Sequence, residues 1–394
     1  MGEWDEKQLC ELVDIGSSKR IFYKEYVPVG IPFYRSKEVI EKHNGKAIST
    51  ELHISIEKYN DIKEKFGVPI EGDMLLTSVG TLGIPYVVQK DEKFYFKDGN
   101  LTWFRNFNNS LLNQFLYYWL ISPVGKGELD MVSIGSTQPA LTIRGLKGIT
   151  INTPPLPEQK AITSVLSSLD DKIDLLHHQN KTLEAMAETL FRQWFVEEAD
   201  EGWEEGIFPD EFDFTMGQSP PGSSYNQEGI GMPMFQGNAD FGFRFPEERV
   251  YTTEPKRLAY LNDTLISVRA PIGAQNMAQK ECCIGRGVAT FHYKHNNSFY
   301  TYTYFKLRSL MDEIRKFNDE GTVFGSIGKT DFQQMETVLA PEDLIEKFEN
   351  EAKPLNDKVI ENCNQIKLLE AIRNTLLPKL MSGEVRVEME LCNV

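Results

Sequence analysis

Residues 156–194, LPEQKAITSVLSSLDDKIDLLHHQNKTLEAMAETLFRQW, decide the fold of this chain. Along this stretch a seam of mainly apolar residues alternates spacings of four and three for more than four heptads, which is typical of a coiled-coil helix. The seam consists of Ile162, Leu166, Leu169, Ile173, Leu176, Asn180, Leu183, Ala187, Leu190 and Trp194. Pro157 suits a first helical turn, where the amide hydrogen that proline lacks would be unpaired anyway. We expect a helix from about residue 157 to residue 196, about 60 Å long, which is a spacer.

The same helix recurs towards the C-terminus. At an offset of 186 positions Leu169-Asp170-Asp171-Lys172-Ile173 matches Leu355-Asn356-Asp357-Lys358-Val359, and Leu183-Glu184-Ala185 matches Leu369-Glu370-Ala371. The second seam consists of Ala352, Leu355, Val359, Asn362, Ile366, Leu369, Leu376 and Leu380. A repeat this long exceeds the solenoid range of roughly 20–50 residues and indicates a duplicated domain. Two copies in one chain predict an internal pseudo-two-fold, and a target or partner with two-fold character.

Prolines and asparagines interrupt the apolar seams. Pro354 and Pro378 are expected to kink or restart the second helix, because proline removes a backbone hydrogen bond. Asn180 and Asn362 occupy seam positions, where they either fix the register of a helix pair or turn towards solvent. The seam positions of both helices are expected to form the coiled coil and the interfaces with other subunits.

The rest of the chain has the pattern of two globular domains. Strands are expected at 73–77 and 263–268, and helices at 110–121 and 299–317. Landmarks recur in both domains, such as Gly30-Ile31-Pro32-Phe33-Tyr34 and Gly231-Met232-Pro233-Met234-Phe235. The predicted fold class is α/β (α+β), with two domains and two long helices. The predicted divisions are 1–153, a first domain; 154–200, a central helix; 201–340, a second domain; and 341–394, a C-terminal helix and tail.

Composition narrows the class of protein. The net charge of −16 argues against nonspecific coating of nucleic acid, so a nucleic-acid role needs local basic clusters and a basic partner. The N-terminus has no signal-peptide pattern and no window is apolar enough for a membrane span, which predicts a cytoplasmic protein without a membrane partner. None of the five cysteines forms a Cys-x-x-Cys pair. Cys282-Cys283 is interpreted as part of a buried strand, with a redox pair as the alternative.

Polar loops with interleaved aromatics recur at matched places in both domains while their residues differ. Arg and Lys can donate to guanine, Asn and Gln can pair with adenine, and Ser and Thr can hold phosphates. Each loop alone is more typical of an ordinary turn or a solvated surface, and the recurrence at matched places in both copies favours DNA binding for the set. The candidate DNA-binding residues are Ser17, Ser18, Lys19, Arg20, Arg35, Ser36, Lys37, Thr77, Ser78, Arg105, Thr137, Gln138, Gln218, Ser219, Ser223, Tyr225, Asn226, Gln236, Asn238, Arg269, Thr322 and Phe324.

Catalytic and metal-binding patterns are not found in the sequence. The six histidines have no metal-ligand spacing, and His177-His178 fits a solvated helix flank. There is neither a nucleophile elbow nor a Gly-rich phosphate loop. We therefore expect no catalytic residue, no metal and no cofactor on this chain.

Several motifs resemble the DNA-specificity subunit of type I restriction-modification systems. Pro155-Leu156-Pro157-Glu158-Gln159-Lys160-Ala161-Ile162 resembles the central helix of that family, and Leu376-Leu377-Pro378-Lys379-Leu380-Met381-Ser382-Gly383-Glu384 resembles its ending. Gly30-Ile31-Pro32-Phe33-Tyr34-Arg35 and Ile266-Ser267-Val268-Arg269-Ala270-Pro271-Ile272-Gly273 resemble its recognition-domain motifs. The resemblance covers essentially the whole chain. The second helix differs from the first at three positions. It has Pro354 in place of Ser168, and Leu380 and Met381 in place of Trp194 and Phe195.

The resemblance implies two target recognition domains, each reading one half of a bipartite sequence in double-stranded DNA, separated by two antiparallel helices. It implies that catalysis belongs to partners: two methyltransferase subunits that bind S-adenosylmethionine, and restriction and translocation subunits that bind ATP and Mg. The alternative function is a coiled-coil scaffold whose domains bind proteins and not DNA. An enzyme in its own right is a third hypothesis, and it lacks a catalytic group of residues.

Overall fold

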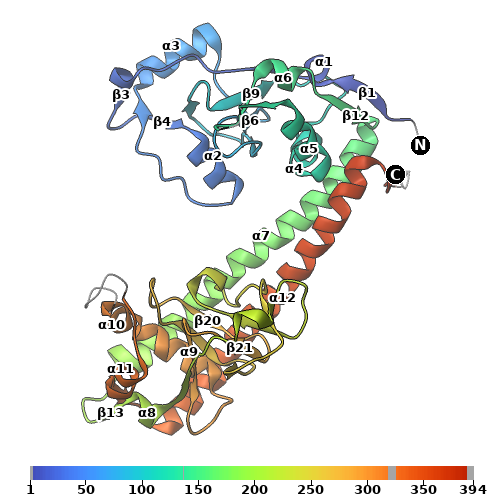
Figure 1. Ribbon diagram of the computed structural model, residues 1–394. Coiled ribbons are helices and arrows are strands. Elements are labelled where there is room, and N and C mark those ends of the chain that lie inside the picture. Colours follow the sequence, from blue (N-terminus) through green and yellow to red (C-terminus); the bar gives the residue numbers. More distant parts are fainter. Residues whose placement is uncertain (1–2, 136, 318–324, 388–394) are drawn as a thin grey trace, which may run out of the picture. The chain divides into compact units, whose positions relative to one another are not determined.

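The computed structural model describes residues 3–135, 137–317 and 325–387 and contains two units (Figure 1). Unit 1 comprises Met1–Ile173 and Leu368–Val394, and unit 2 comprises Asp174–Lys367. Two long helices, α7 (Leu156–Arg192) and α12 (Glu342–Ser382), contribute one part to each unit. Each unit is thus an α+β domain with a pair of helix segments. The four ranges expected from the sequence divide the chain more finely and stay predictions.

Unit 1 contains two four-stranded sheets and two short ribbons. The first sheet has the order β2-β9-β6-β7, with β2 Asp14–Gly16, β9 Leu101–Arg105, β6 Met74–Thr77 and β7 Pro85–Val87. The second has the order β3-β5-β4-β8, with β3 Tyr26–Val27, β5 His53–Ile54, β4 Ile31–Tyr34 and β8 Tyr95–Phe96. The ribbons pair β1 Asp5–Gln8 with β12 Thr150–Thr153 and β10 Ser133–Ile134 with β11 Ala140–Leu141. Its shorter helices are α1 Leu9–Leu12, α2 Ser36–His43, α3 Ile56–Phe66, α4 Asn113–Ile121, α5 Pro123–Val132 and α6 Ile143–Lys147.

Unit 2 is built in the same way. Its first sheet has the order β14-β22-β19-β20, with β14 Phe212–Met216, β22 Val288–Tyr293, β19 Thr264–Ser267 and β20 Gln275–Met277. Its second has the order β15-β17-β16-β21-β18, with β15 Tyr225–Asn226, β17 Tyr251–Thr252, β16 Met232–Phe235, β21 Cys282–Ile284 and β18 Leu258–Ala259. A ribbon pairs β13 Glu204–Ile207 with β23 Glu336–Leu339. The shorter helices are α8 Phe208–Glu211, α9 Tyr300–Ser309, α10 Met311–Lys316 and α11 Lys329–Gln334.

The strand pairing of the two units confirms the duplication. In both, the first sheet is antiparallel throughout, and in both the second sheet contains one parallel pair, β4 with β8 in unit 1 and β16 with β21 in unit 2. Strands β4 and β16 are the two copies of the Gly-Ile/Met-Pro landmark found in the sequence. The duplicated framework is therefore a property of the fold as well as of the long helices.

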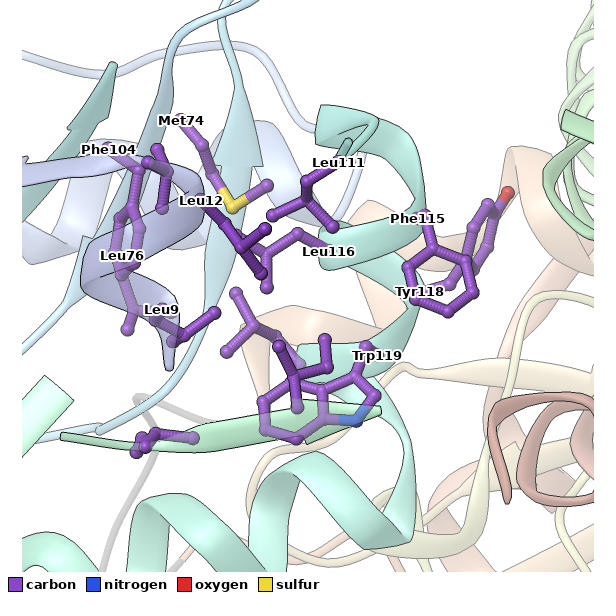
Figure 2. Packing of buried hydrophobic residues seen from close by; sticks show 14 of the residues in the cluster. Leu9, Leu12, Met74, Leu76, Phe104, Leu111, Phe115, Leu116, Tyr118 and Trp119 are labelled. Atoms are coloured by element: carbon purple, nitrogen blue, oxygen red, sulfur yellow. The ribbon is translucent and has the colours of Figure 1, made fainter. Parts of the chain in front are cut away.

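Alternation along β6 explains why unit 1 has a layered core. Met74 and Leu76 pack with α1 and α4 in one hydrophobic cluster, whereas Leu75 between them belongs to the cluster on the other face of the sheet. Figure 2 shows the first cluster, in which Phe104 of β9 and Trp119 of α4 also take part. Because successive side chains of a strand point to opposite faces, a strand that is buried on both faces reads as a continuous apolar run.

The two long helices pair in reverse order within each unit. In unit 1 Arg373 Nη1 lies 2.8 Å from Asp170 Oδ1, and Arg386, in the segment that follows α12, pairs with the earlier residue Glu158. In unit 2 Asn362 Nδ2 donates to Asn180 Oδ1 at 2.9 Å, and the ring of Phe348 contacts that of Phe191. Residue numbers that rise along α7 meet numbers that fall along α12, so the helices are antiparallel in both units.

Most predicted seam residues are buried, and the exceptions follow a drift of the apolar stripe. The buried residues are Ile162, Leu166, Ile173, Leu176, Asn180, Ala187, Ala352, Val359, Asn362, Ile366 and Leu380, and the half-buried ones are Leu169, Leu183, Leu190, Trp194, Leu355, Leu369 and Leu376. Near the end of α7 the most buried side chains are Phe191 and Phe195, one position after Leu190 and Trp194. A straight helix with 3.6 residues per turn drifts relative to a 3.5-residue repeat, which moves the buried line in this way.

The restart expected at the prolines of the second helix is wrong. Helix α12 is continuous from Glu342 to Ser382, through Pro354 and Pro378. Pro354 is exposed, so the carbonyl that loses its partner faces water there. The expected helix at 299–317 is divided at Leu310 into α9 and α10. The expected strands are present as β6 and β19, and Cys282 and Cys283 are buried in β21.

Candidate nucleic-acid interface

Four loop segments meet at the strand ends of each unit. In unit 1 these are residues 17–20, 35–37, 77–79 and 97–100, which we call loop-end cluster 1. In unit 2 they are residues 217–219, 236–238, 267–269 and 285–287, which we call loop-end cluster 2. Three segments of each cluster contain residues that the sequence predicted, and the fourth is a turn that the sequence analysis missed.

Backbone hydrogen bonds hold the turn 97–100 at the centre of loop-end cluster 1. The amide of Lys97 donates to the carbonyl of Tyr34 at 2.9 Å, and the amide of Ser78 donates to the carbonyl of Asn100 at 2.8 Å. These two bonds connect the turn to the ends of β4 and β6. The segment after β2 joins it as well, because the hydroxyl of Ser18 donates to the carbonyl of residue 96 at 2.7 Å.

Ion pairs fix two arginines of loop-end cluster 1. Arg20 Nε lies 2.8 Å from Asp98 Oδ2, so the acid at the tip of the turn is neutralised by a base from the neighbouring segment. Arg35 Nη2 lies 3.0 Å from Glu38 Oε1, and this hydrogen bond raises the pKa of the Arg35 guanidinium. Lys37 is exposed and lies 3.8 Å from a carboxylate one turn along α2, a distance typical of a weak surface pair.

Two further cations of unit 1 meet at Phe66, one at its exposed ring and the other at its backbone carbonyl. Lys19 Nζ lies 4.9 Å from the centroid of the Phe66 ring at the end of α3. Arg105 stacks on the ring of Trp103 at 4.4 Å, and its Nη1 donates to the carbonyl of Phe66 at 3.4 Å. Both were predicted as DNA-binding residues, and the fold brings them together from segments far apart in the sequence.

The equivalent bonds recur in loop-end cluster 2. The amide of Gly285 donates to the carbonyl of Phe235 at 2.8 Å, and the amide of Val268 donates to the carbonyl of Gly287 at 2.9 Å. The turn 285–287 thus occupies in unit 2 the place that 97–100 occupies in unit 1. The backbone arrangement is duplicated, although hardly any side chain is.

Two glycines allow the segments of loop-end cluster 2 to approach closely. A Cβ on Gly287 would lie 2.1 Å from the carbonyl oxygen of Gln236, and one on Gly217 would lie 2.1 Å from that of Gly285. Neither distance is possible for a real side chain. These positions therefore require glycine, and the close packing fixes the backbone of the turn between them.

Three arginines of unit 2 are exposed around this turn: Arg257, Arg269 and Arg286. The carbonyl of Arg257 accepts from the amide of Ile284, which places it beside the start of the turn. Within residues 3–135, 137–317 and 325–387, none of the three has a carboxylate within salt-bridge distance. Positive charge without an internal partner is suited to an external anion such as DNA.

Two predicted residues do not face solvent. The side chains of Thr77 and Ser78 are buried. Thr77 Oγ1 accepts from the amide of Ile84 at 2.9 Å, and Ser78 Oγ bonds to Thr102 Oγ1 at 2.7 Å. In unit 2 Ser267 Oγ accepts from the amide of Ala274 at 2.9 Å, as Thr77 does in unit 1. These hydroxyls stabilise the turn that follows the central strand of each first sheet. Thr77 and Ser78 therefore do not belong to the exposed surface that could contact DNA.

Other predicted residues lie in exposed or partly exposed loops. Thr137 and Gln138 occupy the turn between β10 and β11, and β11 joins loop-end cluster 1 through a bridge between Ala140 and Val79. The corresponding predicted residues of unit 2, Thr322 and Phe324, lie outside the described residues. Ser17, Gln218 and Gln236 are exposed, and Ser36, Ser219 and Asn238 are partly exposed.

A third group of predicted residues lies at an edge strand of unit 2. Tyr225 and Asn226 form β15 at the edge of its sheet, and Ser223 precedes them. Asn226 is engaged within its own hairpin, since its side chain both donates to and accepts from the backbone of Ile230. Tyr225 contacts the residue that follows the segment 217–219 of loop-end cluster 2, since its hydroxyl donates to the carbonyl of Pro220 at 2.9 Å.

The missed turns had a signal in the sequence. Gly285-Arg286-Gly287 places one charged residue between two glycines, directly after a buried run, and Lys97-Asp98-Gly99-Asn100 has the composition of a turn. The two also recur at nearly the offset that separates Gly83 from Gly273, another pair of landmarks. Comparing the copies turn by turn would have added Lys97, Asp98 and Arg286 to the candidates.

The long helices carry exposed apolar side chains that also repeat. On α7 Ala185, Met186 and Thr189 are exposed, and on α12 the residues 186 positions later, Ala371, Ile372 and Thr375, are exposed too. A shallow cavity of about 630 Å³ lies along the α7 stretch. We call residues 182–190 and 368–376 the two helix patches. Each is a surface that a monomer would be expected to cover with polar residues.

The described residues offer neither a metal site nor a membrane-spanning helix. No three His, Cys, Asp or Glu side chains in the described ranges lie together so that they could hold a metal ion. No helix of the described part of the chain is both long and apolar enough to span a membrane.

Comparison with known proteins agrees with this architecture. Residues 1–185 match the model of the type I restriction modification DNA specificity domain. A putative type I restriction enzyme MjaX specificity subunit of Methanocaldococcus jannaschii is 28% identical, over 98% of this chain and 94% of its own. The MjaIX specificity subunit of the same organism is 25% identical over the same shares. The crystal structure of the type I S subunit from M. genitalium has the same fold, with a TM-score of 0.64 at 18% identity and coverage of 98% and 96%. The chain is thus similar to type I restriction-modification specificity subunits over nearly its whole length, and its residues 1–185 match the DNA specificity domain of that family.

Proposed function

We propose that this chain is the non-catalytic DNA-recognition subunit of a type I restriction-modification complex, in which each unit reads one half of a bipartite sequence. The observation that carries the proposal is the duplicated loop-end cluster with different side chains. Arg20 and Asp98 form an ion pair in unit 1, whereas in unit 2 the place of Asp98 holds Arg286, which has no carboxylate within salt-bridge distance among the described residues. One backbone arrangement with two sets of polar side chains suits two different half-sites of double-stranded DNA.

The long helices supply the unread spacer between the half-sites. Helix α7 has 37 residues, which corresponds to about 56 Å at 1.5 Å per residue. Successive major-groove faces on one side of DNA lie about 34 Å apart, so a helix of this length together with the width of the domains fits half-sites one or more turns apart. An antiparallel partner helix stiffens the spacer.

The two helix patches are proposed as docking surfaces for two copies of one partner. Because Met186 and Ile372 occupy the same position in the two copies, each patch offers the partner a similar apolar contact. The family implies that these partners are methyltransferase subunits that carry S-adenosylmethionine, joined by restriction and translocation subunits that use ATP and Mg. Catalysis then takes place on those subunits, on chromosomal DNA in the cytoplasm.

Methylome sequencing of cells with and without this chain tests DNA reading. We expect one split methylated motif to disappear on deletion, which gives both half-sites and the gap between them. The combined substitution of Arg35, Lys37 and Arg269 by alanine should abolish that motif while the subunits still assemble. A scaffold that does not read DNA would keep the motif in that variant, and a footprint without an unread spacer would contradict bipartite reading.

Partner stoichiometry tests the helix patches. Met186→Asp and Ile372→Asp should each reduce the number of methyltransferase subunits bound from two to one in native mass spectrometry, and the double variant should bind none. Leu175→Glu is a matched control, because Leu175 is also exposed on α7 but the position 186 residues later is already Glu361. It should leave both subunits bound.

A further inference from the structure

Arg286, at the tip of the turn 285–287, has a backbone that hydrogen bonds hold in place and a side chain that is exposed. The amide of Arg286 donates to Ser219 Oγ at 3.3 Å, and the residues on either side are buried glycines. Gly285 is bonded to the end of β16, and the carbonyl of Gly287 accepts from Val268 at the end of β19. The backbone of Arg286 is therefore fixed by three other segments, while its side chain is exposed.

An exposed arginine in this position does little for the stability of the unit. Among the residues that the structure describes, no carboxylate lies within salt-bridge distance of its guanidinium. A rigid backbone limits the conformations that the side chain must lose when it binds, so the cost of ordering it on a ligand is small. The guanidinium presents a planar fork of donors, which matches the O6 and N7 acceptors of guanine in the major groove.

The position of the turn within loop-end cluster 2 indicates which arginine would face the bases and which would face the phosphates. The turn is hydrogen-bonded to the segments 217–219 and 267–269 and to the end of β16, whereas Arg257 lies just before β18 and Arg269 just after β19. When a surface of this kind lies against a duplex, its central residues face the groove and its outer residues face the two sugar-phosphate strands that border the groove. Arg286 is central, whereas Arg257 and Arg269 are placed for phosphates.

We propose that Arg286 is a specificity-determining residue of unit 2 that reads one guanine of its half-site. This inference rests on the proposed DNA-reading function. In unit 1 the equivalent turn carries Asp98, which is neutralised by Arg20, so the same place presents a guanidinium that comes from a different segment and is held in a different orientation. The two units accordingly use one frame to read unlike bases.

The test uses the chain assembled with its methyltransferase subunits and a duplex that carries the motif found by methylome sequencing. Dissociation constants are measured for duplexes in which each half-site base pair is replaced in turn. Arg286→Ala should weaken binding to the intact site by about 10- to 100-fold, which is what one bidentate arginine–guanine pair is worth. At one G·C pair of the half-site, base replacement should weaken binding by the parent complex by the same roughly 10- to 100-fold. The same replacement should leave the dissociation constant of the Arg286→Ala complex almost unchanged.

Two variants serve as controls. Arg286→Lys keeps the charge but not the fork, and should lose most of the discrimination at that pair while retaining affinity better than the alanine variant. Lys294→Ala removes one exposed positive charge at the other end of β22, and should leave the discrimination at every pair unchanged.

Two results would overturn the inference. One is a loss of affinity in Arg286→Ala that is equal for every duplex and accompanied by a shallower salt dependence, as for a phosphate contact. The other is no loss at all. In both cases the parent complex still binds its split site, so the proposed function stands. A parent complex that binds no split site would overturn the function and the inference together.

Discussion

Asn362 Nδ2 donates a hydrogen bond to Asn180 Oδ1 at 2.9 Å between two antiparallel helix segments of unit 2, and both side chains are buried. Asn180 also donates to Cys363 Sγ at 3.5 Å. An asparagine pair inside an apolar seam is satisfied only when the two residues lie opposite each other. The pair therefore specifies one register of the helices at a cost in stability.

Replacing one asparagine should be more harmful than replacing both. Asn180→Leu leaves Asn362 buried without its partner, which should lower the free energy of unfolding by about 1–3 kcal/mol, and Asn362→Leu should act similarly. The double leucine variant should regain most of this stability. Urea denaturation of the four proteins gives the coupling energy. Gln179→Leu, at the exposed neighbouring position, is the control and should change little. Additive effects of the two single variants in the double variant would contradict the pairing.

Glu184 anchors α7 to the globular part of unit 2. Its Oε1 accepts from Arg308 Nη1 at 2.6 Å and from Arg244 Nη2 at 3.2 Å, and the Arg244 side chain is fully buried against the ring of Tyr304. Removal of the carboxylate leaves a buried guanidinium without a counter-ion, so Glu184→Ala should lower the unfolding free energy by about 3–5 kcal/mol.

Glu188 is the matched control for this second prediction. It lies one helical turn further along α7 and 3.6 Å from Arg308, but it is half exposed. Glu188→Ala should therefore cost less than about 1 kcal/mol. Differential scanning calorimetry of the two variants compares them directly. Similar losses for both would show that the buried pair does not hold the helix.

The glycine contacts of loop-end cluster 2 should matter for DNA binding. Gly287→Ala and Gly217→Ala each introduce a Cβ that would lie 2.1 Å from a backbone oxygen, so the segments must separate. We expect at least a tenfold loss of affinity for the split site. Gly222→Ala is the control, because no atom lies within 4 Å of the added Cβ. Electrophoretic mobility shifts at one salt concentration provide the measurement, and unchanged affinity in Gly287→Ala would argue against a role for the turn.

His292 should make the stability of unit 2 depend on pH. Its Nδ1 lies 3.5 Å from Asp263 Oδ1, and this interaction raises the pKa of the imidazole. A raised pKa in the folded state favours the protonated form, so the contribution is complete below the unfolded pKa of about 6.5 and is lost as pH rises through the folded value. His292→Gln should reduce the fall in melting temperature between pH 6 and pH 8. The exposed His177→Gln should not, and identical pH profiles for parent and His292→Gln would refute the assignment.

Local patterns in the sequence were sufficient for the long helices and the duplication. The spacing from Ile162 to Leu176 predicts a buried helical stripe, because burial on a helix depends on residues three and four positions apart. The match between Leu169 and Leu355 predicts two units with one framework, and the strand orders of both units confirm it. The resemblance to the family rests on the same local motifs.

The tertiary structure decided which loop segments meet in each loop-end cluster. Lys97 reaches Tyr34, and Gly285 reaches Phe235, through backbone hydrogen bonds between segments about 50 to 60 residues apart, which leave no periodic trace in the sequence. Burial was decided in the same way: Thr77 has the residue type of a DNA contact, but the fold turns its hydroxyl to the amide of Ile84. A residue type shows what a side chain can bind, whereas long-range packing determines whether it faces the solvent or the interior of its own unit.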